Sequence, residues 1–267
     1  MPDEFNIDEV GKLLRMLLDA LPERPGVVDG VSTQRAKRLR GEIETLLSRL
    51  RLLAEGLDPI RRPEFIFDLS DPKHVGEIIA NTLVQQPRVA MGNLPKFYGS
   101  GVYAIYYNGA FPAYRPIKGK ETPIYVGKAD PPTPDAKTVV DQGTRLWGRL
   151  KDHAKSIRVA QEAPQGNLKL DDFNYRFLVV QSGWQKSAED RLIHRFHPIW
   201  NEAICYGFGK HGDSPDTRKN TRSPWDTLHS GRAWATREGN KPNPLSPDQI
   251  ISRIAAHYGK YPPQTQH

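Results

Sequence analysis

The side chains of this sequence whose types and spacing could perform chemistry together are two tyrosines, an arginine and a histidine on one helix, and a later carboxylate. Arg149 and His153 are four residues apart, which places both on one face of a helix. Glu189 falls near the start of a later helix, and Tyr103 and Tyr125 lie in short apolar runs typical of strands. Hydrolysis of a phosphodiester bond needs a deprotonated water, neutralised transition-state charge and help for the departing oxygen. These residue types could supply all three.

Each residue type suits one part of that reaction. A divalent cation held by Glu189 would neutralise phosphate charge and activate water, and Mg²⁺ keeps several of its own waters, so one protein carboxylate is enough. The planar fork of Arg149 can clamp phosphate oxygens. Tyr103, Tyr125 and His153 could orient or deprotonate the water, but a tyrosine with a pKa of about 10 becomes a base only where cations lower that pKa. Spacing alone leaves open that the tyrosines are core residues and the Arg–His pair a solvated face.

Composition narrows the function classes. No motif for a P-loop, a dinucleotide site, a zinc cluster or a serine nucleophile is present, and the single cysteine, Cys205, excludes an internal disulfide. Lys and Arg outnumber Asp and Glu by 38 to 31, which gives a net charge of +7 that suits a polyanionic partner. The N-terminus lacks the layout of a signal peptide, and no apolar run approaches the ~18 residues of a membrane span. We therefore expect a cytoplasmic protein with no membrane association.

Residues 1–57 are predicted to form two helices joined by a turn, as an extension to the part that carries the chemistry. In the second helix, apolar residues recur at alternating spacings of three and four over three heptads; they are Ala36, Leu39, Ile43, Leu46, Leu50, Leu53 and Leu57. This pattern is typical of the seam of a coiled coil. A helical hairpin packed within one chain is an equally good interpretation.

The elements that must position the candidate residues follow a linker at 58–63. Hydrophobic periodicity predicts helices at about 71–87, 145–157 and 187–197, and strands at 102–107, 124–128 and 173–181. The order strand, strand, helix, strand, helix predicts an α/β (α+β) domain with a small sheet of few strands flanked by helices. A long segment rich in Gly, Pro and Lys, 108–123, separates the first two strands. We expect the chain to end, at 237–267, in a short helix near 246–258 and a frayed tail.

Five successive segments resemble the motifs of the GIY-YIG nucleases: Gly101-Val102-Tyr103, Tyr125-Val126-Gly127-Lys128, Arg149 with His153, Glu189, and Asn201. Longer segments, from GVYAIYY and TPIYVGKADP through GRLKDH, RFLVVQSGW and AEDRLIHRFHPIWN to TRSPWDTLHSGRAWA, are similar to type II restriction endonucleases that cut CCGCGG. This similarity covers about 60–236. Valine replaces isoleucine in both tripeptides, and the first 57 residues have no counterpart in a minimal enzyme of this kind.

The resemblance implies a catalytic role for each motif residue. Tyr103 is expected to act as the general base or to orient the water, with Tyr125 and His153 beside it in one proton network. Arg149 is expected to bind the scissile phosphate, and Glu189 to hold a single Mg²⁺ ion in each active site. Asn201 and Lys128 complete the set: Asn201 would stabilise the site by hydrogen bonding, and Lys128 would counter phosphate charge.

The same resemblance suggests where DNA lies. Segment 108–123 is interpreted as a DNA-facing insertion whose cations near phosphates are Arg115, Lys118 and Lys120. Arg or Lys paired with guanine is the commonest base-specific contact. The candidate residues for such contacts with bases lie in the loop region 206–236; they are Lys210, His211, Arg218, Lys219, Arg222, Asp226 and Arg232. Some of these side chains are expected to contact phosphate only and to fix the register.

The leading hypothesis is a homodimeric restriction endonuclease, because a palindromic DNA target mirrors a two-fold protein. Its domains would be 1–57, the nuclease at 58–236 and a C-terminal helix with a tail at 237–267, and a DNA methyltransferase would be its functional partner. One alternative is a GIY-YIG nuclease of the homing or repair type. Another is a catalytically silent DNA-binding or assembly protein in which the N-terminal seam drives oligomerisation.

Overall fold

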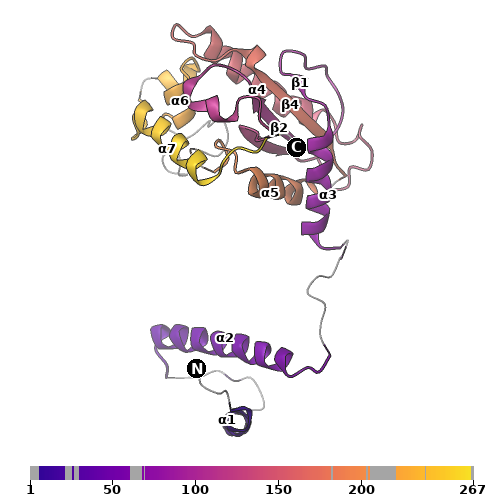
Figure 1. The fold of residues 1–267 in the computed structure, drawn as a ribbon, viewed down its shortest axis with the longest axis vertical. Coiled ribbons are helices and arrows are strands. Elements are labelled where there is room, and N and C mark those ends of the chain that lie inside the picture. The colour runs from indigo at the N-terminus through magenta and orange to yellow at the C-terminus, as the bar shows by residue number, and fades with distance from the viewer. Residues whose placement is uncertain are drawn as a thin grey trace. The chain divides into compact units, whose positions relative to one another are not determined.

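The chain divides into two compact units, Met1–Ile66 and Phe67–His267, in a computed structural model of the protein (Figure 1). The structure describes residues 6–21, 26, 30–60, 68, 70–181, 183–202, 204, 221–237 and 239–265. None of the described helices is both long enough and apolar enough to cross a membrane.

The N-terminal unit consists of two helices, α1 (Ile7–Ala20) and α2 (Thr33–Gly56), as predicted. Their starts are set by local hydrogen bonds, since the side chain of Asn6 accepts from the second and third backbone amides of α1 and Ser32 caps α2 in the same way. Neither helix contains a buried residue among those described.

The second unit is built around a four-stranded antiparallel sheet with the order β1-β4-β2-β3. Its strands are β1 (Val89–Ala90), β2 (Gly101–Tyr107), β3 (Tyr125–Ala129) and β4 (Phe173–Val179). The three longer strands were predicted, and the fold class is confirmed. The two-residue β1 was missed, because so short a segment carries no periodicity.

Alternate residues of β2 face two separate cores, which makes this a three-layer arrangement. Tyr103, Ile105 and Tyr107 face the layer that contains α4 (Arg145–Glu162), α6 (Pro224–Leu228) and α7 (Pro247–Lys260) (Figure 1). Val102, Ala104 and Tyr106 face α3 (Pro72–Gln85) and α5 (Gln185–Phe196). β2 is buried along its whole length for this reason, and β3 forms one edge of the sheet.

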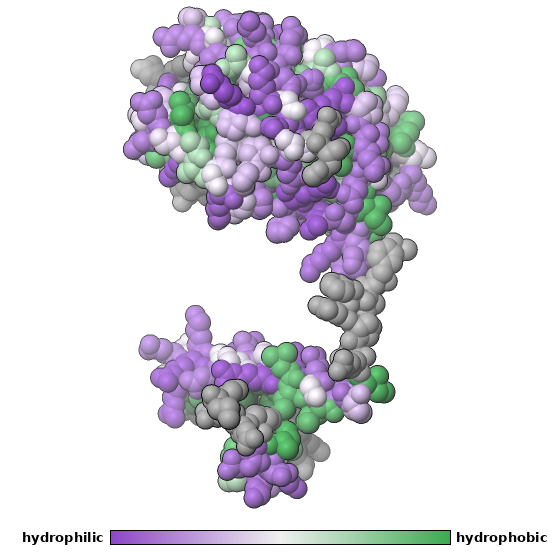
Figure 2. All heavy atoms as spheres, viewed as in Figure 1, coloured by the Kyte–Doolittle hydropathy of each residue, from purple (hydrophilic) through white to green (hydrophobic). Residues whose placement is uncertain are grey.

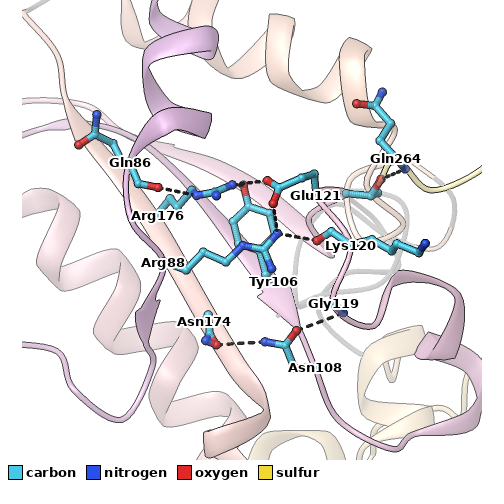
Figure 3. Close-up of polar contacts among 11 residues, drawn as sticks. Gln86, Arg88, Tyr106, Asn108, Gly119, Lys120, Glu121, Asn174, Arg176 and Gln264 are labelled. Carbon is cyan, nitrogen blue, oxygen red and sulfur yellow. Dashed lines mark hydrogen bonds and ion pairs between the residues drawn. The ribbon is translucent and has the colours of Figure 1, made fainter. Parts of the chain in front are cut away.

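The segment between the two tyrosine strands is attached to the sheet at both of its ends (Figure 3). The side chain of Asn108 accepts from Gly119 N (3.2 Å) and donates to Asn174. Glu121 accepts from Arg88 (2.8 Å) and from Arg176, and both guanidiniums lie over the ring of Tyr106. A short 3₁₀ turn, η1 (Pro112–Ile117), packs against α7 between these anchors. The insertion is therefore part of the folded domain.

The C-terminal part is more structured than the sequence indicated. The predicted loop region contains α6, with Trp225 fully buried, and the 3₁₀ turn η3 (Ala233–Thr236). The predicted frayed tail is wrong as far as Gln264, whose backbone pairs with Glu121 and Thr122 (Figure 3). In both places the order comes from tertiary contacts, which the local sequence does not encode.

Candidate active site

The two glycines of the tyrosine motifs are required by close packing in the sheet. Tyr103 on β2 pairs with Gly127 on β3, and a Cβ atom at Gly127 would lie 2.5 Å from the Tyr103 hydroxyl oxygen. A Cβ atom at Gly101, where φ is +154°, would lie 2.1 Å from the carbonyl oxygen of Leu178 on β4. Glycine at both positions therefore lets the ring of Tyr103 lie flat against β3 while β2 stays paired with β4.

Tyr103, Tyr125 and His153 form one aromatic cluster between the sheet and α4. The Tyr103 hydroxyl is 2.7 Å from His153 Nε2. The ring of Tyr125 lies 6.1 Å from that of Tyr103 and 5.0 Å from that of His153, measured between centroids. Tyr103 is fully buried and Tyr125 is 8% exposed. The structure thus brings the three predicted residues together, with Tyr125 nearest to solvent.

Burial sets the protonation states of this cluster. It raises the pKa of Tyr103 well above the usual tyrosine value and also raises the pKa of Tyr125, while the neighbouring Arg149 charge acts against both increases. Burial, together with the charges of Arg149 and Arg232, lowers the pKa of His153 to about 3. At neutral pH the two tyrosines therefore carry their protons, and His153 is a neutral ring with one nitrogen able to accept a proton.

Arg149 borders a cleft of about 630 Å³ beside the edge strand β3. Tyr125 also lines this cleft, as does Glu189. Arg149 comes from α4 and Glu189 from α5, which cover opposite faces of the sheet, so the cleft lies where both helices reach its β3 edge. The positive charge of Arg149 acts on both tyrosine hydroxyls and opposes the rise in their pKa. A phosphate in the cleft would meet this cation.

The Glu189 carboxyl is partly buried in the cleft wall. Burial raises its pKa, while the charges of Lys128 and Lys186 act in the opposite direction. Within the described part of the chain, no hydrogen bond or ion pair joins this carboxyl. Nor do three or more His, Cys, Asp and Glu side chains of the described residues gather into a metal-binding group. Asp130 and Asp152 also line the cleft but are exposed. A partly buried carboxylate with open space beside it suits Mg²⁺, an ion that keeps several waters, better than a metal held in an all-protein cage.

Asn201 and Lys128 support the edge strand. Asn201 forms two hydrogen bonds with the backbone of Val126: its Oδ1 accepts from the amide (2.9 Å) and its Nδ2 donates to the carbonyl (2.8 Å). These bonds hold β3 in place at Val126, the residue between Tyr125 and Gly127. Lys128 lines the cleft and pairs with Asp130. The roles expected of both residues in catalysis stay predictions.

The predicted DNA contacts lie in several places. Arg115 and Lys118 are exposed on or beside η1 and are not among the residues that line the cleft. The carbonyl oxygen of Lys120 accepts from Arg88 (2.6 Å), and the amide of Arg222 donates to Lys241 O beside α6. The remaining predicted contacts lie outside the described residues; they are Lys210, His211, Arg218 and Lys219.

Arg232 and Asp226 are placed differently from the prediction that they read bases. Asp226 is 2% exposed and accepts from Arg232 Nε (2.6 Å) and Nη2 (2.7 Å) and from the hydroxyl of Ser223. The Arg232 guanidinium lies over the rings of Trp225 (4.5 Å) and Trp234 (5.4 Å). This bidentate pair is buried and satisfied, so the structure speaks against both side chains as base readers. A basic residue in a polar segment gave no sign of that burial.

Four further polar residues line the cleft that sequence reasoning did not single out: Asp130, Thr144, Arg145 and Asp152. Arg145 precedes Arg149 by one helical turn, and this spacing was the available signal for it. Arg145 Nε donates to the carbonyl oxygen of Asp130 (3.0 Å), which ties the end of β3 to the start of α4. Nothing in the local pattern marks Thr144 or Asp152.

A comparison with protein families agrees with this geometry. A family model described as the Eco29kI GIY-YIG domain matches residues 95–258, which run from β2 into α7 and include every residue that lines the cleft. No curated protein matches the chain at a significant level. Because the match covers more than half of the 267 residues, the chain belongs to the GIY-YIG restriction endonuclease family represented by the Eco29kI domain.

Proposed function

We propose that this protein is a metal-dependent, site-specific endonuclease of a type II restriction-modification system that cuts double-stranded DNA at a short GC-rich palindrome, with CCGCGG as the target to test first. One observation carries the catalytic part of this proposal. A single cleft brings together a phosphate-binding cation (Arg149), a tyrosine backed by a neutral histidine (Tyr125, Tyr103 and His153), and a partly buried carboxylate that no hydrogen bond or ion pair from the described residues joins (Glu189).

Glu189 is the residue that would hold the metal, and Mg²⁺ is the ion that fits. A carboxylate with a raised pKa and open space beside it matches a hard cation that completes its own shell with water and phosphate oxygen. When bound, such an ion would stabilise charge on the scissile phosphate and help to activate a water.

The protein groups would move the proton in a fixed order. Tyr125 faces the cleft, and Tyr103 lies behind it with its hydroxyl 2.7 Å from His153 Nε2. A water in the cleft would pass its proton through the tyrosine hydroxyls to this neutral histidine, while Arg149 holds the phosphate. A bound phosphate also offsets the Arg149 charge, which is one of the causes that lower the pKa of His153, so substrate binding makes the histidine a better base.

Cleavage of both strands at one site would use two copies of the chain. Each copy supplies one cleft, and a palindrome presents the same sequence to two subunits related by a two-fold axis. A cognate DNA methyltransferase would protect the host sites. The family match supports action on DNA, and the net charge of +7 is consistent with it.

Replacement of Glu189 by glutamine tests the metal role. Glu189→Gln keeps the size of the side chain but weakens a Mg²⁺ site, so we expect cleavage to fall by about 10² or more, and added Mg²⁺ to stop raising the melting temperature of the protein. Asp190→Asn is the matched control, because Asp190 is exposed and pairs with Lys186. Cleavage by Glu189→Gln at the wild-type rate would remove the metal role.

Mapping the ends of a digested, methylation-free plasmid tests the specificity. A restriction enzyme gives discrete fragments whose ends share one palindrome. A ladder of nicks without site preference would instead favour a nuclease of the homing or repair type. Binding without turnover in Mg²⁺ would favour a silent DNA-binding protein.

A further inference from the structure

The helix α2 presents an apolar seam whose first half the described residues of its unit leave exposed. Leu39 is 42% exposed, Ile43 56% and Leu46 42%, and none of the described residues of α1 or α2 is buried. Figure 2 shows hydrophobic residues gathered on the surface of the N-terminal unit. A helix of this kind gains most of its stability in water from packing of its apolar face.

Helix α1 does not cover this seam in the described part of the unit. Its own apolar side chains are also exposed, with Leu13 at 62%, Met16 at 68% and Leu18 at 69%. Along the seam of α2, intermediate burial is reached by Leu50 and Leu53, near the end of the helix, and in α1 by Val10 and Leu14. The described residues of this unit therefore leave the first half of the seam exposed.

We infer that the partner is a second copy of this chain, and that the two α2 helices pair side by side in antiparallel directions. The charged residues that flank the seam favour the antiparallel direction. With Ala36, Ile43 and Leu50 at heptad position a and Leu39, Leu46 and Leu53 at position d, Glu42 and Arg49 both fall at position g. An antiparallel pair brings position g of one helix beside position g of the other, so Glu42 of each copy lies beside Arg49 of its partner.

A parallel pair fits the same helix less well. It would bring Arg35 at position g beside Arg40 at position e of the partner, which places like charges together. It would also place Ala36 opposite Ala36 and leave that layer thin. In the antiparallel register Ala36 packs opposite Leu53, and Leu39 packs opposite Leu50, so every layer holds at least one large side chain.

This inference deepens the proposed function, because it names the element that holds two nucleases together. The role of the α2 pair in DNA cleavage rests on that proposal, whereas its antiparallel register does not. Pairing of α2 can fail while the cleft still cuts DNA, and Glu189→Gln can abolish cutting while α2 still pairs.

Disulfide mapping in the full-length protein tests the register. In a Cys205→Ser background, Leu39→Cys and Leu50→Cys chains with different affinity tags are co-expressed, oxidised and analysed on non-reducing gels, and the DNA cleavage of each is measured alongside. We expect a cross-link between the two different chains and little cross-linking of either variant with itself. Ser48→Cys, at the outer position f, is the control and should stay monomeric on the gel.

The other outcomes overturn the inference. Efficient self-cross-linking of Leu39→Cys would show a parallel pair. Absence of any cross-link, with cleavage retained, would show that α2 does not pair with a second copy, and the nuclease proposal would still stand.

Charge reversal adds a test that leaves the seam intact. Glu42→Arg and Arg49→Glu each place like charges side by side twice in the dimer, so we expect each to weaken association about tenfold and to lower the yield of the 39–50 cross-link. The double variant restores opposite charges and should restore the yield. Arg51→Glu, at the outer position b, is the matched control. Failure of the double variant to recover would overturn the antiparallel register.

Discussion

The buried hydroxyl of Tyr103 lies 2.7 Å from the Nε2 atom of His153, the neutral nitrogen that would take up the proton. Tyr103→Phe removes this hydroxyl and keeps the ring that packs on Gly127. Because the proton path would be cut, we expect single-turnover DNA cleavage to fall by about 10² or more. The free energy of unfolding should fall by only about 1–3 kcal/mol, the cost of leaving one buried polar atom without its partner.

Tyr175→Phe is the control for that variant. Tyr175 lies on β4 in the same core, and its hydroxyl donates to the carbonyl oxygen of Asn93 (3.2 Å). Loss of the Tyr175 hydroxyl should lower the free energy of unfolding by about as much as Tyr103→Phe does. It should leave the cleavage rate within about twofold, since general acid–base catalysis needs a group close to the reacting atoms. Equal cleavage by Tyr103→Phe and Tyr175→Phe would contradict a catalytic role for the Tyr103 hydroxyl.

A second buried histidine, His229, gives the nuclease unit a predictable sensitivity to acid. Burial lowers its pKa to about 3, whereas the unfolded chain binds the same proton at about pH 6.5. Between these values the unfolded state holds more protons, so stability is complete above about pH 6.5 and falls as the pH falls toward 3. His229→Gln, which never gains this proton, should make the slope of unfolding free energy against pH shallower by up to about 1.4 kcal/mol per pH unit.

Urea unfolding followed by tryptophan fluorescence measures this slope, because all five tryptophans lie after residue 67. His229→Gln should also be less stable at pH 7, because the ring of His229 forms two hydrogen bonds. Its Nε2 lies 2.6 Å from the Tyr114 hydroxyl, and its Nδ1 lies 2.7 Å from Asn167 Oδ1. His194→Gln, at an exposed position of α5, should leave the slope unchanged. A wild-type slope in His229→Gln would show that this histidine does not contribute to acid unfolding.

The residue types of the site could be predicted from the sequence, but their contacts could not. Tyr103, Arg149 and Glu189 were found because their chemistry and order are distinctive. The pair between Arg232 and Asp226 was missed, because its burial depends on Trp225 and on segments far apart in the chain. A sequence shows which charges exist, whereas the fold decides which of them are neutralised.

At the scale of elements, the contact between β2 and β3 fixes the position of the Tyr103 ring. A Cβ atom at Gly127 would lie 2.5 Å from the Tyr103 hydroxyl oxygen and 2.6 Å from Cζ. Because Tyr103 is fully buried, the ring has no free space into which to move. Gly127→Ala should therefore cost about 1–3 kcal/mol of unfolding free energy and lower the cleavage rate by about 10² through a displaced hydroxyl.

Gly259→Ala is the matched control, because a Cβ atom there meets nothing within 4 Å and the residue lies in α7. It should raise stability by up to about 1 kcal/mol and leave cleavage unchanged. If Gly127→Ala cleaved DNA at the wild-type rate, the close packing of the two strands would not be what positions the ring.

Elements with strong periodicity could be predicted, and elements fixed by tertiary contacts could not. β2 was found because its seven residues form one apolar run, and α4 was found because its apolar residues recur at helical spacing. The short α6 starts at a Ser223 cap and holds Trp225 in the core, yet its five residues are too few to show a period. The length of 108–123 was noted, but its attachment through Glu121 to Arg88 and Arg176 depends on residues from three separate segments.

At the scale of the whole molecule, the two units differ in what they need from a partner. Every fully buried hydrophobic side chain of the described residues lies after Phe67, in two clusters on the two faces of the sheet. The nuclease unit therefore has its own core, whereas the N-terminal unit has apolar faces and no buried residue among those described. The nuclease unit should fold alone, and the N-terminal unit should gain its stability from association.

Deletion of residues 1–66 should therefore leave cleavage of one DNA strand intact and impair the cleavage of both strands in a single binding event. We expect the shortened protein to lose only the circular dichroism signal of α1 and α2 and to keep its Mg²⁺-dependent cleavage of single phosphodiester bonds. With the α2 pair removed, the second subunit must arrive independently, so plasmid DNA at low protein concentration should accumulate as nicked circles where the full-length protein gives linear DNA. The effect should disappear at high protein concentration, since mass action restores the second subunit. Direct linearisation at low concentration would show instead that the nuclease units pair without the N-terminal helices.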